Sequence, residues 1–465
     1  MTHHQHALLI FRRDLRLEDQ TALIEACAKS NTVSLAFIFD PKQIEPHPYQ
    51  SLPAFAWMLH TLQALHEQLR QFHQSGLNIY TGAPSEVIEI LLQTQSVDAI
   101  YLNRDYTPFS RQRDQAIQAV GLSYDTPIYW YDDALLNPPT TIRNKQQQPY
   151  QVFSAFYKLA LTIPVSPPQT VPLSNIHPMS ETEWQTHAQT ITQMILKHAT
   201  TPPQTTPGRS GALTALAHID ALANYALDRD IPSLDASSKL SVHLKFGTLS
   251  VREVYQAVAS MLGPEHPLIR QLYWRDFFTH IAFHHPSVFG HCYLPQFESL
   301  TWRNHQAHFA AWCSGNTGFP IVDAGMRELL QTGYMHNRVR MITASFLVKD
   351  LHIDWRLGEG WFARHLLDYD PALNNGNWQW AASTGCDAQP WFRIFNPWRQ
   401  QERFDPETLY IKRWLPHLKR CWVKTIHQWH TLGDANLHPL PIVDHAIEAK
   451  VAQTCYREAT TQQNP

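Results

Sequence analysis

The chain has 465 residues, which predicts two or three domains from a usual size of roughly 100 to 200 residues each, with two as the working number. A net charge of −3 and a pI near 6.8 exclude an overall basic field. The bulk charge therefore neither supports nor excludes DNA as a partner, and any DNA site has to be a local patch.

Five short apolar runs alternate with helical patterns over residues 1–133. The runs at 6–11, 32–39, 77–82, 97–103 and 126–132 are typical of buried strands, and helices are predicted at 19–29, 51–75, 84–95 and 109–120. This alternation predicts a Rossmann-like α/β domain with a parallel five-stranded sheet covered on both faces.

Residues 134–207 are rich in Pro, Thr and Gln and predict a long interdomain connector with one or two short helices. Over 208–465 strand patterns vanish and 3.6-residue periodicity predicts an all-α domain. The start MTHHQHALLIF has no cleavage signature, no run approaches 18 apolar residues, and the six cysteines form no Cys-x-x-Cys pair. We expect a soluble, cytoplasmic protein with no membrane contact and no metal.

The stretch DYDPALNNGNWQWAAS (368–383) places two carboxylates, Asp368 and Asp370, just before paired asparagines. Taken alone, these residues are typical of a helix cap with Pro371 at the first helical position. Capping does not explain the two indoles of Trp378 and Trp380. If the segment is helical, these two side chains point about 200° apart.

The sequence resembles the photolyase and cryptochrome flavoproteins, most closely the enzymes that repair cyclobutane pyrimidine dimers. The resemblance rests on seven ordered stretches: 11–23, 237–250, 271–278, 315–329, 333–355, 368–383 and 393–397. It implies light-dependent repair, in which reduced FAD absorbs blue light and gives an electron to a dimer flipped out of DNA. Base flipping is a property of photolyases as a family, and only the resemblance extends it to this chain.

The resemblance also implies the residues that hold FAD. Asn374 matches an asparagine beside flavin N5, and Arg340 and Asp368 match an ion pair near the flavin ring. The other residues matching the cofactor site are Tyr225, Ser237, Ser238, Lys239, Leu240, Ser241 and Asp370. Read without the family, the Ser-Ser-Lys-Leu-Ser run is only an N-cap signal.

Three tryptophans match an electron-transfer chain: Trp378 nearest the flavin, Trp355 in the middle and Trp302 at the surface. The resemblance assigns Trp274 and Trp380 to the walls of the substrate cavity, which Asn337 and Met341 also line. Enzymes that repair the (6-4) photoproduct carry histidines at these last two positions, so the chain favours cyclobutane dimers.

Gln271 departs from the family, because dimer-repairing enzymes place a glutamate there. Glutamine can donate an N–H but supplies no acidic proton, so we expect retained binding and a lower repair yield. Candidates for contacts with DNA are Arg229, Arg338, Arg393 and Lys412.

Residues 103–111, after a predicted strand, match the region where relatives hold an antenna chromophore. The sequence leaves open whether that is a folate, a deazaflavin, another flavin or nothing. Two alternatives stay open: a cryptochrome-type blue-light photoreceptor, disfavoured by the short tail after about residue 445, and (6-4) repair. Damaged DNA is the expected partner and a monomer the expected state.

Overall fold

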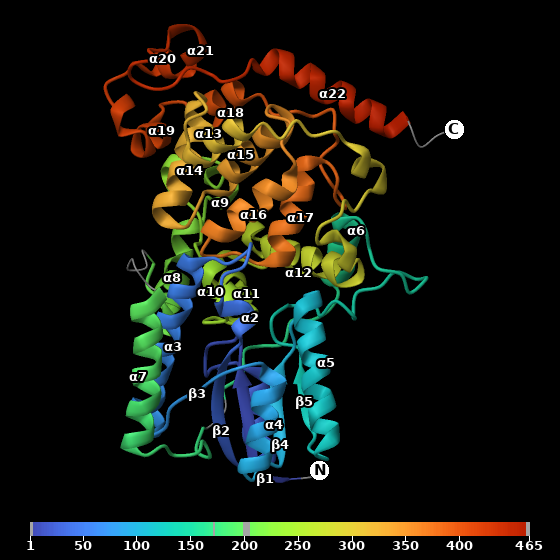
Figure 1. Ribbon diagram of the computed structural model, residues 1–465, viewed down its shortest axis with the longest axis vertical. Coiled ribbons are helices and arrows are strands. Elements are labelled where there is room, and N and C mark those ends of the chain that lie inside the picture. Colours follow the sequence, from blue (N-terminus) through green and yellow to red (C-terminus); the bar gives the residue numbers. More distant parts are fainter. Residues whose placement is uncertain (1–2, 171–172, 199–204, 462–465) are drawn as a thin grey trace. The chain divides into compact units, whose positions relative to one another are not determined.

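The computed structural model describes residues 3–170, 173–198 and 205–461 (Figure 1). The chain forms two compact units: unit 1 comprises 1–150, 154–220 and 238–284, and unit 2 comprises 151–153, 221–237 and 285–465. The predicted domain boundaries, 1–133, 134–207 and 208–465, stay a prediction.

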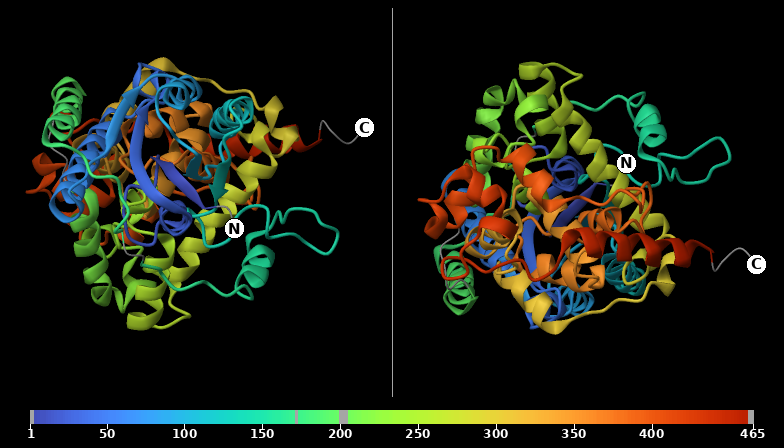
Figure 2. Two further views of the ribbon diagram at one scale, coloured as in Figure 1. Left: turned by 90° about the horizontal axis from the view of Figure 1, so that it is seen from below. Right: turned by 90° about the horizontal axis from the view of Figure 1, so that it is seen from above.

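Unit 1 contains a five-stranded parallel sheet in the order β3-β2-β1-β4-β5. Figure 2 shows helices on both sides of this sheet. The central strands are buried on both faces, which explains why they read as continuous apolar runs. All five predicted strands are confirmed: β1 (His4–Phe11), β2 (Ser30–Phe39), β3 (Asn78–Thr81), β4 (Ala99–Asn103) and β5 (Ile128–Tyr131).

The four predicted helices between these strands are also confirmed. Ser51 caps α3 by accepting a hydrogen bond from the Ala54 N–H, and Thr107 caps α5 in the same way through the Ser110 N–H. The helices up to the connector are α1 (Thr21–Lys29), α2 (Pro41–Ile44), α3 (Leu52–His73), α4 (Pro84–Thr94) and α5 (Pro108–Ser123).

The predicted connector contains α6 (Phe153–Ala160) and α7 (Glu181–His198), while its residues 171–172 and 199–204 lie outside the described residues. The expectation of only short helices was wrong for α7, which has 18 residues. Its Trp184 ring stacks on His66 of α3, with ring centroids 4.9 Å apart. Tertiary packing of this kind stabilises a helix whose polar sequence predicts little.

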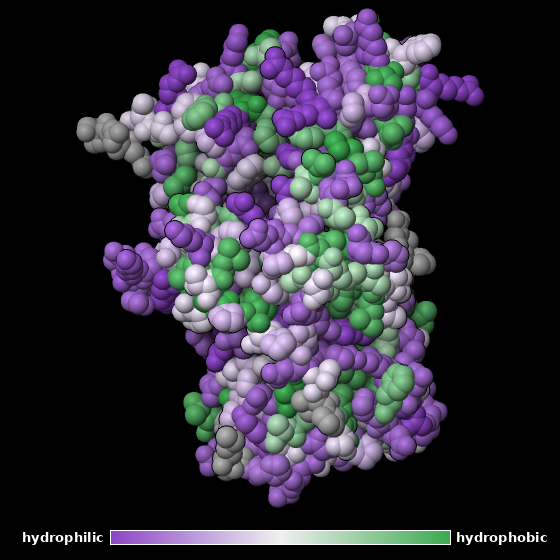
Figure 3. All heavy atoms as spheres, turned by 180° about the vertical axis from the view of Figure 1, so that it is seen from behind, coloured by the Kyte–Doolittle hydropathy of each residue, from purple (hydrophilic) through white to green (hydrophobic). Residues whose placement is uncertain are grey.

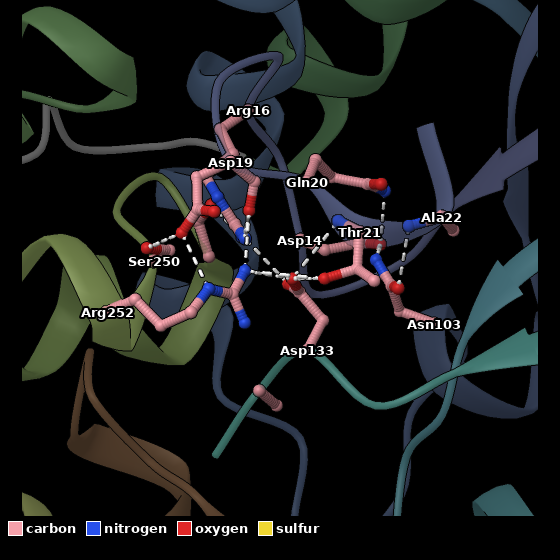
Figure 4. Close-up of polar contacts among 12 residues, drawn as sticks. Asp14, Arg16, Asp19, Gln20, Thr21, Ala22, Asn103, Asp133, Ser250 and Arg252 are labelled. Carbon is pink, nitrogen blue, oxygen red and sulfur yellow. Dashed lines mark hydrogen bonds and ion pairs between the residues drawn. The ribbon is translucent and has the colours of Figure 1, made fainter. Parts of the chain in front are cut away.

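Later residues join unit 1 through a buried network of charges (Figure 4). Asp133, after β5, accepts hydrogen bonds from Arg16 and Arg252, both at 2.7 Å. Arg252 also pairs with Asp19 at 2.8 Å. Arg252 lies on α11, whose N-cap is Ser250, so this network fixes the 238–284 segment. The helices of unit 1 beyond the connector are α8 (Gly208–Ala217), α10 (Ser241–Phe246), α11 (Val251–Leu262) and α12 (Pro267–His284).

Unit 2 is helical, with no strand among its described residues. Its core contains four buried indoles, those of Trp312, Trp355, Trp378 and Trp429. The helices are α9 (Tyr225–Asp228), α13 (Gln306–Ser314), α14 (Pro320–Thr332), α15 (Asn337–Lys349), α16 (Trp355–His365), α17 (Pro371–Ala382), α18 (Pro397–Phe404), α19 (Leu409–Trp414), α20 (Val423–His427), α21 (Trp429–Leu432) and α22 (His445–Thr461). Short 3-10 turns are η1 (His218–Leu222), which begins in unit 1, and η2 (Pro232–Leu234), η3 (Pro286–Val288), η4 (Pro295–Ser299) and η5 (Pro416–Leu418) of unit 2.

The predicted tail after about residue 445 is instead the helix α22. Its Glu448 carboxylate receives the Arg303 guanidinium at 2.9 Å and the His352 ring at 2.8 Å. Tyr456 on the same helix donates to the Ala382 carbonyl at 2.6 Å and is buried. These contacts hold the helix against unit 2.

No helix within 3–170, 173–198 and 205–461 is long and apolar enough to cross a membrane. On the face drawn in Figure 3, hydrophobic residues lie in separate groups among hydrophilic ones. In the described part of the chain no group of three His, Cys, Asp or Glu side chains could hold a metal ion, and the expected absence of a metal stays a prediction.

Candidate functional site

Helix α17 presents its two indoles, Trp378 and Trp380, on different sides. Asp370 caps the helix by accepting hydrogen bonds from the N–H groups of Ala372 (3.0 Å) and Leu373 (3.2 Å), and Pro371 is its first residue. The capping interpretation therefore holds for Asp370. The predicted helix is confirmed, with Trp378 2% exposed in the core and Trp380 half-buried.

Asn374, also on α17, has an oriented side chain. Its Nδ2 donates to the Glu359 carbonyl oxygen at 3.0 Å. Because that partner is an acceptor only, the amide orientation is fixed and Oδ1 points away from it. Oδ1 receives no hydrogen bond from any described residue, although the side chain is only 8% exposed. The site thus contains an oriented acceptor, on a largely buried side chain, that is available to a ligand.

A polar cluster behind Asn374 escaped the sequence analysis. Asn375 donates to the Val288 carbonyl (2.9 Å) and to the Glu359 carboxylate (3.0 Å), and its own Oδ1 receives a hydrogen bond from Gln379 at 3.1 Å. Burial raises the pKa of Glu359 to about 7. The only signal for this cluster in the sequence is the spacing of Asn375 and Gln379, which places both polar residues on the same side of the helix as Trp378.

The predicted ion pair of Arg340 and Asp368 is present, and it is bidentate. Two guanidinium nitrogens of Arg340 contact the two carboxylate oxygens at 3.2 and 3.0 Å, and Nε donates to the Met335 carbonyl at 2.7 Å. The guanidinium also lies 5.2 Å from the Tyr334 ring centroid. The Tyr334 hydroxyl hydrogen-bonds the predicted site residue Ser237 at 3.2 Å. Burial raises the pKa of Tyr334 to about 12.

The three predicted relay tryptophans all lie in unit 2. Trp355 and Trp378 are buried, and Trp302 is half-buried against the same core. The Trp378 ring meets Phe362 edge-on with centroids 5.0 Å apart. A Cβ added at Gly358, one turn after Trp355 on α16, would lie 2.2 Å from Trp378 Cη2, so α16 and this indole are in close contact. The buried Trp378 Nε1 has no hydrogen-bond partner among the described residues.

Other predicted residues of unit 2 differ in how accessible they are. Asn337 is exposed on α15, and its Nδ2 lies 3.7 Å from Met341 Sδ, one turn later. Arg393 is exposed and Lys412 is half-buried, and neither pairs with a carboxylate in the described part of the chain. Arg229 is half-buried, with its guanidinium 5.8 Å from the Tyr225 ring centroid.

Arg338, a predicted contact for DNA, has a guanidinium that is already paired within the chain. Its guanidinium pairs with Asp230 at 2.7 Å and lies 4.3 Å from the Phe404 ring centroid. Sequence reasoning could not find this because Asp230 precedes Arg338 by more than a hundred residues.

The remaining predicted residues belong to unit 1. Lys239 has a left-handed backbone with φ of 51°, and Leu240 is the N-cap of α10 without a side-chain capping bond. Exposed Ser241 starts that helix, and Ser238 Oγ lies 3.5 Å from the Leu240 N–H.

On α12, Gln271 and Trp274 are half-buried and one turn apart. Gln271 Nε2 makes only a long contact of 3.5 Å with the Pro267 carbonyl. The predicted residues are thus divided between the units.

Comparison with known proteins gives one family over most of the chain. A family model described as DNA photolyase matches residues 7–173, and one described as FAD binding domain of DNA photolyase matches 268–458. A deoxyribodipyrimidine photo-lyase of Alkalihalophilus pseudofirmus is 37% identical, with 96% of this chain and 97% of that protein covered.

Two solved structures are similar over nearly their full lengths. An archaeal photolyase from Sulfolobus tokodaii, determined with two FAD molecules, has a TM-score of 0.86 and 39% identity, with 98% of this chain and 100% of that chain covered. A cryptochrome from Synechocystis has a TM-score of 0.85 and 28% identity over 98% of this chain and 100% of that chain. The predicted fold class, an α/β domain followed by a helical FAD-binding domain, is confirmed.

Proposed function

The chain belongs to the DNA photolyase family, and from that premise we propose that it is a deoxyribodipyrimidine photo-lyase. It repairs cyclobutane pyrimidine dimers in DNA in a light-dependent reaction. The single observation of the structure that carries the proposal is the buried, oriented amide of Asn374, whose Oδ1 has no partner among the described residues.

The side chains of unit 2 fit FAD. Asn374 offers an acceptor for a protonated ring nitrogen, and Arg340 with Asp368 offers a fixed charge pair. When bound and reduced, FAD supplies the absorption of blue light and the electron that splits the dimer. Tyr225 and Ser237 offer hydroxyls to its ribitol and phosphates. We propose the same kind of contact for the 238–241 run of unit 1, because hydroxyls and uncapped N–H groups suit an anion. Asp370 contributes by capping α17.

Trp378, Trp355 and Trp302 relay electrons inward through unit 2. Two of these indoles are buried and the third is half-buried, a gradation that suits a path from the solvent to the interior. The Nε1 atoms of Trp378 and Trp355 are both buried without a hydrogen-bond partner among the described residues.

We propose that Trp274 of unit 1 and Trp380 of unit 2 each offer an aromatic ring on which the bases of a flipped-out dimer can stack. Gln271 offers an N–H to a pyrimidine carbonyl, and Asn337 and Met341 of unit 2 are further proposed contacts with the dimer. We propose Arg393, Lys412 and Arg229 as contacts for phosphates. Arg338 is a further proposed contact for phosphates, and its ion pair with Asp230 orients its guanidinium.

The activity of a (6-4) enzyme is disfavoured by Asn337 and Met341, neither of which can donate the proton that this reaction needs. The cryptochrome-type photoreceptor remains the second candidate, because the Synechocystis cryptochrome has the same fold. We propose a monomer in the cytoplasm. A second, light-harvesting chromophore at 103–111 is consistent with the two FAD molecules of the Sulfolobus tokodaii photolyase, and its identity stays open.

The decisive experiment mixes the reduced flavoprotein with DNA carrying a thymine cyclobutane dimer and compares light with dark. We expect loss of the dimer only in the light. Binding of the DNA without turnover would contradict the repair function and favour the photoreceptor.

A further inference from the structure

Residues 397–427, in unit 2, carry a local charge opposite to that of the whole chain. Seven Lys and Arg face three Asp and Glu there, a net charge of +4 against −3 for all 465 residues. The seven basic residues are Arg399, Arg403, Lys412, Arg413, Lys419, Arg420 and Lys424. Apart from Lys412, which is half-buried, all are exposed.

None of the seven pairs with a carboxylate among the described residues. One nearby carboxylate, Asp405, is buried and accepts the N–H groups of Tyr410 (3.0 Å) and Ile411 (2.9 Å) instead. Other arginines of unit 2 do pair, for example Arg340 with Asp368 and Arg356 with Glu298. The positive charge of the segment is therefore uncompensated.

An exposed indole lies inside this charge. Trp422 is 82% exposed, whereas Trp429, seven residues later, is fully buried. The exposed cations Arg420 and Lys424 lie two residues before and two residues after Trp422. An indole flanked by free cations is the combination with which proteins bind single strands, because bases stack on the ring and phosphates attract the cations.

Hydrogen bonds between distant residues of the segment 397–427 hold it together. Gln401 on α18 donates from Nε2 to the Ile426 carbonyl of α20 at 3.0 Å, and the His427 ring hydrogen-bonds the Pro406 carbonyl at 2.9 Å. The helices α19, α20 and α21 lie at the same end of unit 2 in Figure 1, and α20 contacts both α18 and α21. The cations of α18 and those around α20 therefore belong to one packed group of helices.

We propose that Lys419, Arg420, Trp422 and Lys424 form a second DNA contact, separate from the dimer pocket, which binds the phosphates and an unstacked base of undamaged DNA. This inference rests on the proposed function for the identity of the partner, and extends it to affinity that does not depend on a lesion. The indole supplies a stacking surface and the three cations neutralise phosphates.

The test uses the holoenzyme and a long undamaged single-stranded oligonucleotide, with Kd measured between about 50 and 200 mM salt. In the triple variant Lys419→Gln, Arg420→Gln, Lys424→Gln we expect the slope of log K against log salt to fall by about 2, because each phosphate neutralised on a single strand contributes roughly 0.7 to that slope. Trp422→Ala is expected to weaken binding about tenfold without changing the slope, because stacking is not ionic.

A matched control removes the same charge elsewhere: Lys145→Gln, Lys158→Gln, Lys197→Gln changes three exposed lysines of unit 1. An equal loss of slope in this control would overturn the proposal, as would unchanged affinity in Trp422→Ala. Loss of binding to phosphatidylserine vesicles with unchanged DNA affinity would also overturn it, in favour of a membrane surface.

Repair of a dimer in a very short oligonucleotide separates this proposal from the function itself. We expect the triple variant to repair that substrate as the wild type does. Absence of repair in both proteins would contradict the photo-lyase activity, whereas a repair defect confined to the variant would place these residues in the dimer pocket and overturn the second contact.

Discussion

The guanidinium of Arg16 lies 2.7 Å from the carboxylate of Asp133, and each side chain is 2% exposed. Burial opposes the charge on Asp133, but Arg16 and Arg252 outweigh it and hold its pKa well below the ordinary value. Breaking a buried pair by removing one charge leaves the other unpaired, which costs about 3–5 kcal/mol. Arg16 follows β1, the central strand of the sheet, and Asp133 follows β5, an edge strand, so their ion pair links the ends of these two strands.

Asp133→Asn is therefore expected to lower the free energy of unfolding by about 3 kcal/mol, measured by urea denaturation. Because the folded-state pKa is depressed, the contribution of Asp133 is present above its unfolded pKa near about 4 and is lost as the pH falls below it. The wild type should lose this stability in acid and the variant should not. Glu181→Gln, which breaks the exposed Arg70–Glu181 pair, should cost less than about 1 kcal/mol, and a similar cost for both variants would refute the prediction.

Glu359 should make stability depend on pH in the opposite sense. Burial raises its pKa to about 7 from 4.5, so its ionised form is disfavoured in the folded state. The free energy of unfolding should fall as the pH rises from about 4.5 to 7.

Glu359→Gln keeps an acceptor for Asn375 and should raise stability at high pH by about 2–3 kcal/mol. Urea midpoints at acidic and alkaline pH measure the effect. Glu402→Gln, an exposed change of the same kind, should leave the pH dependence intact. If both variants kept the wild-type pH dependence, Glu359 would not be its source.

Trp378→Phe should slow photoreduction of oxidised FAD while the pre-reduced enzyme still repairs dimers, because an indole is more easily oxidised than a phenyl ring. Transient absorption and a repair assay measure the two separately. Trp312→Phe is the control, because Trp312 is equally buried and its ring centroid lies 6.2 Å from that of Trp378. Loss of both activities in Trp378→Phe with FAD retained would show that this indole is not in the relay.

Gln271→Glu should raise the repair yield per absorbed photon in the pre-reduced holoenzyme. A carboxylic acid can supply an acidic proton to the dimer, and the gain should be larger at low pH, where more of the acid is protonated. Gln256→Glu on α11 makes the same change of charge at an exposed position and should have no effect. An unchanged or lower yield in Gln271→Glu would mean that the amide meets the needs of the substrate.

The sequence predicted the sheet well because strands buried on both faces form continuous apolar runs, as Ala7 to Phe11 of β1 and Ala99 to Leu102 of β4 do. It also predicted the pairing of Arg340 with Asp368 and the helix that carries Asn374 and Trp378. These features depend on residues near one another in sequence or on motifs of the family.

Contacts between distant residues could not be predicted. The salt bridge of Arg338 with Asp230 and the position of Glu359 behind Asn375 depend on how helices pack, which periodicity does not determine. The helix α22 could not be predicted for the same reason. Its sequence is polar on average, as in a tail, and contacts of Tyr456 and Glu448 with other residues of unit 2 hold it in place.

The charge network of unit 1 also sets an order for folding during synthesis. Arg252 follows Asp133 by roughly 120 residues, so at about 5–20 residues per second the ribosome makes it some 6–24 s later. Until then Asp133 of the nascent α/β part has Arg16 but lacks Arg252, and the Asp19 carboxylate lacks its arginine, which is Arg252. The α/β part of the chain therefore reaches its final stability only after Arg252 has been synthesised. The time between the synthesis of Asp133 and that of Arg252 is an interval in which a chaperone can bind it.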